Sequence, residues 1–63
     1  MKVGDKVFIT ENAATLLGLE DGIEFTIVDI LILKVDFPVV LNAPQFGDDW
    51  VEFFGTNEII EIT

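Results

Sequence analysis

Carboxylates are the most abundant reactive groups of this chain. Its 63 residues hold twelve Asp and Glu against three Lys, without Arg or His, so the formal net charge is −9 at pH 7. Side chains of this type can ligate hard cations, assist hydrolysis in pairs, or form a fixed anionic surface. The carboxylates considered for such roles are Glu20, Asp21, Glu24, Asp29, Asp36, Asp48, Asp49, Glu52, Glu58 and Glu61.

The residue inventory does not favour catalysis or metal binding. The chain has no His, Cys or Tyr to act as or to activate a nucleophile. Paired carboxylates can hydrolyse glycosides, but 63 residues leave little room for a pocket that buries a sugar. Asp48, Asp49 and Glu52 could offer oxygen ligands, but their spacing does not fit an EF-hand loop. The five glycines stand singly and form no phosphate-binding loop. We therefore expect a protein that is not an enzyme and that has no metal or cofactor.

The composition predicts one folded domain over residues 1–63. A disordered acidic tail is poor in apolar residues, whereas this chain is 51% apolar and has six Phe. The charge is therefore carried on a compact surface. No signal peptide or membrane span is evident, so a cytoplasmic protein is expected. The negative charge argues against direct binding of nucleic acid or of anionic membranes, and favours a basic partner.

Turn residues divide the chain into five short segments rich in β-branched and aromatic residues. A short helical turn is expected over 13–17, with Asn12 as its N-cap and Gly18 as its stop. The loop before the fourth strand is predicted from its composition, and the turn before the fifth has 3₁₀ character. The predicted strands cover 6–10, 23–35, 39–41, 49–54 and 59–62.

The pattern of the second predicted strand changes midway. Residues 23–27 alternate apolar with polar side chains, as in a half-buried strand. Past Val28 the alternation slips, because Asp29 stands where an apolar residue is due. Ile30 and Ile32 then take the inward positions. One extra residue near Ile27 and Val28 fits a β-bulge, or a bend where the strand passes between two sheets.

The slip also leaves Leu31 and Leu33 on the opposite face of that strand. A monomer of this size could not easily cover both faces. Exposed contiguous apolar surface usually marks an interface. Leu31 and Leu33 are therefore predicted to form a homodimer interface.

The fourth predicted strand can be oriented in two ways. If Val51 and Phe53 point inward, then Trp50 and Phe54 form an exposed aromatic patch beside Glu52. In the opposite phase Trp50 belongs to the core. The sequence leaves both orientations open.

The opening Val3-Gly4-Asp5-Lys6-Val7 resembles the first strand of many SH3-like barrels. The run Asp49-Trp50-Val51-Glu52-Phe53-Phe54, a turn, and Ile59-Ile60-Glu61-Ile62 are similar to the last two strands of those domains. The resemblance implies an all-β, five-stranded SH3-like barrel with one short helical turn. In size, acidity and lack of catalytic residues the chain also resembles acidic host-takeover proteins of lytic Bacillus phages. Some of those proteins imitate DNA and inhibit the nucleoid protein HU.

The density of charge can be compared with that of DNA. A compact domain of this length is about 27 Å across, and a duplex of that length carries about sixteen phosphates. The net charge of −9 is more than half of that value. We expect a DNA mimic that inhibits a basic DNA-binding host protein. Three alternatives remain: charge that only maintains solubility, an interaction module that uses an apolar groove around Trp50 and Phe54, and a phage structural or assembly subunit.

Overall fold

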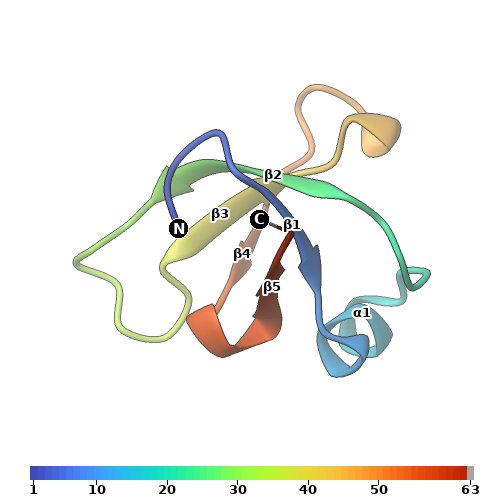
Figure 1. Ribbon diagram of the computed structural model, residues 1–63, viewed down its shortest axis with the longest axis horizontal. Helices are drawn as coiled ribbons and strands as arrows, with labels where there is room; N and C mark the ends of the chain where they lie inside the picture. Colours follow the sequence, from blue (N-terminus) through green and yellow to red (C-terminus); the bar gives the residue numbers. More distant parts are fainter. Residues whose placement is uncertain (63) are drawn as a thin grey trace.

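Five short antiparallel strands form a single sheet in the order β4-β3-β2-β1-β5 (Figure 1). A computed structural model describes residues 1–62. The prediction of an all-β fold with one short helix is confirmed. The arrangement is compatible with a small SH3-like barrel. The first four strands pair in sequence order, and after a 3₁₀ turn the last strand returns to pair with β1. The elements are β1 (Lys6–Ile9), α1 (Glu11–Leu17), β2 (Phe25–Ile30), β3 (Val39–Asn42), η1 (Pro44–Phe46), β4 (Glu52–Phe54), η2 (Thr56–Glu58) and β5 (Ile59–Glu61).

Helix α1 begins earlier than the sequence predicts. Thr10 is extended, with φ −66° and ψ 157°, and its hydroxyl accepts a hydrogen bond from the Ala13 N–H at 3.3 Å. Thr10 is thus the N-cap, and the prediction that Asn12 caps the helix is wrong. Gly18 ends α1 as predicted, in the left-handed conformation with φ 71° that favours glycine.

The predicted bulge is confirmed in β2, but the strand is shorter than expected. Its register with β3 shifts between Ile27 and Asp29. β2 ends at Ile30, which pairs with the first residue of β3, Val39. The Leu31 N–H donates to the carbonyl of Pro38, the residue just before β3, at 2.6 Å. Proline has no N–H with which to continue the pairing.

Residues 31–38 therefore form a connection between β2 and β3, on the left of Figure 1. The Lys34 N–H donates to the Leu31 carbonyl at 2.9 Å and closes a turn within it. Ile32, predicted to point inward, is 88% exposed. The prediction of a strand to residue 35 is wrong because no neighbouring strand pairs with this part of the chain.

The orientation of β4 is also settled. Phe54 is buried, with 1% of its surface exposed, and Trp50 packs against the core while half-buried. The Phe25 ring lies 6.0 Å from the rings of both, centroid to centroid. The alternative with Trp50 in the core is therefore correct, and an exposed Trp50–Phe54 patch is not. Val51 and Phe53 are exposed instead. The buried core cluster comprises Val7, Ile9, Ala13, Ala14, Ile23, Phe25, Ile27, Val39, Leu41, Ala43 and Phe54.

Gly55 is the buried residue before η2, and we expect Gly55→Ala to destabilise the fold. An added Cβ would lie 2.8 Å from Asn57 Oδ1 and 3.0 Å from the Asp36 carbonyl oxygen. Since the latter is backbone, relief requires a main-chain shift, which typically costs about 1–3 kcal/mol. Urea unfolding followed by circular dichroism measures this loss. Thr56→Ala, at an exposed neighbour, is the control, and equal midpoints for both variants would contradict the prediction.

Candidate functional site

The anionic surface is largely uncompensated by the chain's own cations. Within residues 1–62 the ion pair joins the amino group of Met1 to Glu61 Oε1 at 3.0 Å, and no lysine side chain pairs with a carboxylate there. Lys6 Nζ donates to the Thr26 hydroxyl at 2.8 Å. Lys34 Nζ lies 5.6 Å from the centroid of the Phe53 ring. The carboxylates therefore remain available to an external partner.

Several predicted site residues also have local structural roles. Asp21, Asp29 and Glu52 each accept a hydrogen bond from the N–H of the following residue, at 3.1, 2.8 and 3.2 Å. Glu58 Oε1 accepts from the Gly55 N–H at 2.8 Å and closes a capping arrangement around η2. Glu52 and Glu58 are half-buried, whereas the other eight predicted carboxylates are exposed. The sequence did not indicate the capping role of Glu58.

The acidic pair Asp48–Asp49 lies in the turn after η1, in the loop between β3 and β4. Two contacts shape this loop. The side-chain amide of Asn42 donates to the Trp50 carbonyl at 2.6 Å and to the Gly47 carbonyl at 3.4 Å. The Phe46 ring packs on the Trp50 ring with centroids 5.1 Å apart. Both carboxylates are exposed and accept no hydrogen bond within residues 1–62.

The second acidic group follows α1. Asp21 and Gly22 form the predicted turn, in which Gly22 has φ 83°, and Ile23 anchors the chain in the core. Glu20 and Glu24 are exposed on either side. This segment lies at the right of Figure 1, and the loop that contains η1 lies at the top.

The two acidic groups and Asp36 therefore occupy different sides of the molecule and do not make one continuous array. Asp36 belongs to the connection 31–38, away from both groups in Figure 1. The Cα trace measures 29 × 23 × 23 Å, close to the size expected from chain length. Within residues 1–62 no three carboxylates converge on a position that could hold a metal ion.

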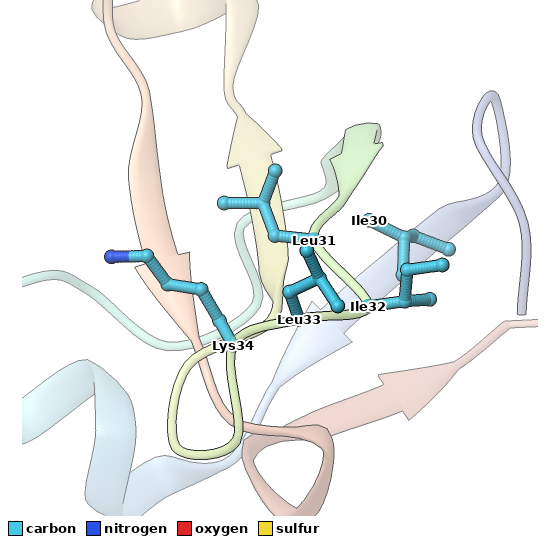
Figure 2. Close-up of a pocket in the computed structure, with 5 residues that line it drawn as sticks. All are labelled: Ile30, Leu31, Ile32, Leu33 and Lys34. Atoms are coloured by element: carbon cyan, nitrogen blue, oxygen red, sulfur yellow. The ribbon is translucent and has the colours of Figure 1, made fainter.

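The connection 31–38 carries an apolar surface whose form the sequence did not reveal. Ile32, Leu33 and Val35 are 88%, 95% and 93% exposed, whereas Leu31 is half-buried. Figure 2 shows the side chains of residues 30–34 around a shallow hollow of about 370 Å³. The apolar run was visible in the sequence. Its placement in a turn was not, because the same pattern suits a buried strand.

A second hollow, of about 480 Å³, is found between α1, the connection 31–38 and η2. Leu16, which is 82% exposed, and Phe37, 53% exposed, supply its large apolar side chains. Sequence reasoning missed it because its walls come from three separate segments. Its lining residues are Thr10, Asn12, Ala13, Leu16, Phe37, Asn57 and Glu58.

Comparison with known proteins adds no family to this description. No protein-family model, curated protein or solved structure matches the chain. Among residues 1–62 no helix has the length and apolar character needed to cross a membrane.

Proposed function

We propose that this protein is a non-enzymatic acidic binding protein that imitates DNA and inhibits a basic, DNA-binding protein of the nucleoid type, such as HU. The observation that carries the proposal is the exposed set of carboxylates that the chain's own lysines leave unpaired within residues 1–62. On its resemblance to phage host-takeover proteins, it would act in the host cytoplasm.

The dimensions and charge support this proposal. A duplex as long as the largest extent, 29 Å, carries about seventeen phosphates. The protein presents a net charge of −9 over a similar length. Its acidic groups lie on several sides of the body, and this suits a partner that grips or wraps a duplex. Each carboxylate that meets a lysine or arginine of the partner would replace one phosphate contact.

Competition with DNA tests the proposal directly. A labelled duplex bound to an HU-type protein is titrated with this protein, and release is followed by fluorescence anisotropy. We expect release at low salt and a steep loss of affinity as salt rises. For six to ten phosphate-like contacts the loss is about 10³–10⁵-fold between 50 and 200 mM salt.

A mobility-shift assay with the protein and duplex alone is the control, and no shift is expected because both are anionic. Direct binding to duplex would contradict DNA imitation. So would a nucleoid protein that keeps its DNA in the presence of excess acidic protein.

The hollow between Leu16 and Phe37 favours a second candidate function, an SH3-like module that holds an apolar segment of a partner. This relocates the groove from Trp50 and Phe54, which pack in or against the core. Such binding should change little with salt, so the salt dependence of partner binding separates the two functions.

A further inference from the structure

We propose that the exposed apolar connection between β2 and β3 is the contact surface for a second copy of this chain, and that the protein is a two-fold symmetric homodimer. The contact surface consists of Ile32, Leu33 and Val35, together with Lys34. Leu31, which the sequence places in the same interface, is half-buried and contributes from the base of the turn.

The side chains of this surface are presented outward together. Ile32, Leu33 and Val35 are each at least 88% exposed, which is unusual for three large apolar residues so close in sequence. Figure 2 shows Lys34 directed toward β4, where its Nζ lies 5.6 Å from the ring centroid of Phe53. Phe53 is itself 42% exposed. The apolar surface therefore extends from the turn to the outer face of β4.

Charge indicates which partner fits. The six residues between Asp29 and Asp36 contain one charged side chain, Lys34, in a chain of net charge −9. Nucleic acid and anionic membranes are repelled by the whole molecule. A basic partner would be attracted to the acidic loops elsewhere on this protein and would be repelled by Lys34 at this surface.

A second copy suits the same surface. In a two-fold arrangement the same patch serves on both subunits. Lys34 of each copy then faces Asp36 of the other, an exposed carboxylate two residues further along the same connection. Lys34 has no carboxylate partner of its own within residues 1–62. The patch is thus apolar at its centre and self-complementary in charge at its edges.

The area required sets the extent of the interface. A stable interface buries about 800 Å² per partner, roughly a fifth of the 4284 Å² accessible surface of one chain. The four residues of the contact surface are fewer than the roughly 20–30 residues that each side of a standard interface contributes. We therefore expect the interface to extend onto Phe53, whose ring centroid lies 5.6 Å from Lys34 Nζ. The acidic groups at 20–24 and 48–49 lie on other loops. The dimer should therefore persist or tighten as salt screens the repulsion between the two acidic chains.

Sedimentation velocity on the whole chain at micromolar concentration tests the proposal. Wild type should sediment at twice the chain mass of 7.0 kDa, at low and at high salt. Leu33→Asp should give monomers with an unchanged β-type circular dichroism spectrum, since residue 33 is 95% exposed. The matched control is Leu16→Asp, an equally drastic change at a residue 82% exposed outside the surface, which should remain dimeric.

A charge exchange tests that the partner is a second copy. Lys34→Glu alone should weaken self-association at least tenfold, and Asp36→Lys alone should do the same. An equimolar mixture of the two variants should dimerise again.

Val35→Asp replaces Leu33→Asp if that variant does not fold. Three results would overturn the proposal: a wild type that stays monomeric, aspartate variants that remain dimeric, or assemblies larger than a dimer. Assemblies larger than a dimer would indicate an assembly subunit instead. None of these results depends on competition with DNA.

Discussion

Phe25→Ala should leave little folded protein. Phe25 is fully buried, and its ring lies 6.0 Å from the rings of Trp50 and Phe54. It thereby joins β2 to the segment around β4, although β3 separates the two strands. Truncating a buried Phe costs about 3–5 kcal/mol. At about 0.05–0.15 kcal/mol per residue, the whole stability of a domain this small is only about 3–9 kcal/mol.

Far-ultraviolet circular dichroism during urea unfolding measures this effect. Leu16→Ala is the control, because Leu16 is large and apolar but 82% exposed, and its loss should change stability by less than about 1 kcal/mol. A Phe25→Ala protein with a cooperative transition within 1 kcal/mol of wild type would show that the aromatic cluster does not hold the core together.

Reversing the charge of Asp48 and Asp49 should greatly reduce competition with DNA. Both side chains are exposed and have no hydrogen-bond or ion-pair partner within residues 1–62, so Asp48→Lys with Asp49→Lys should leave the fold intact. Glu52 is left unchanged, since it is half-buried and accepts a bond from the Phe53 N–H. We expect at least a hundredfold loss in apparent affinity. The slope of log affinity against log salt should fall by about two, one for each phosphate-like contact removed.

The matched control changes the same number of charges elsewhere. Glu20→Lys with Glu24→Lys, at two exposed side chains, also takes the net charge from −9 to −5, two reversals of two units each. If the loop between β3 and β4 makes the contact, this control should lose only the few-fold that its smaller long-range attraction explains. Equal losses from both pairs would mean that total charge decides, and no loss from either would contradict DNA imitation.

Local signals in the sequence predicted much of the fold. The stop at Gly18 and the turn at Gly22 were correct because each needs a left-handed backbone, which glycine adopts readily. The bulge after Ile27 was visible as a slip in the alternation of side chains. These features depend on a few neighbouring residues, so a single sequence contains the information.

The errors arose where a distant segment decides the structure. β2 ends at Ile30 because β3 begins opposite it, and nothing in residues 31–35 states where that partner strand starts. β4 is three residues long, too short for its alternation to show which face is inward. The sequence alone could not show whether Phe53 or Phe54 points into the core. In the structure Phe54 does, because its ring packs against Phe25.

The candidate site was predictable in composition but not in arrangement. Acidic residues were read directly from the sequence, and most are exposed. Their distribution over separate loops follows from the topology, and the capping role of Glu58 follows from a backbone N–H that only the folded chain brings near. Leu31 and Leu33 are predicted to lie on a strand, whereas the structure places both in the connection 31–38, with Leu31 half-buried and Leu33 95% exposed.

The amide of Asn42 has a consequence for affinity. A flexible loop loses conformational entropy when a partner immobilises it, about 1–2 kcal/mol for each residue fixed. Here the bonds to the Trp50 and Gly47 carbonyls bracket Asp48 and Asp49, so this ordering accompanies folding. A partner would meet two carboxylates on a loop whose backbone is already ordered. Less of the binding free energy would then be lost to ordering the loop. Preorganisation of this kind is expected to tighten a complex without any additional contact.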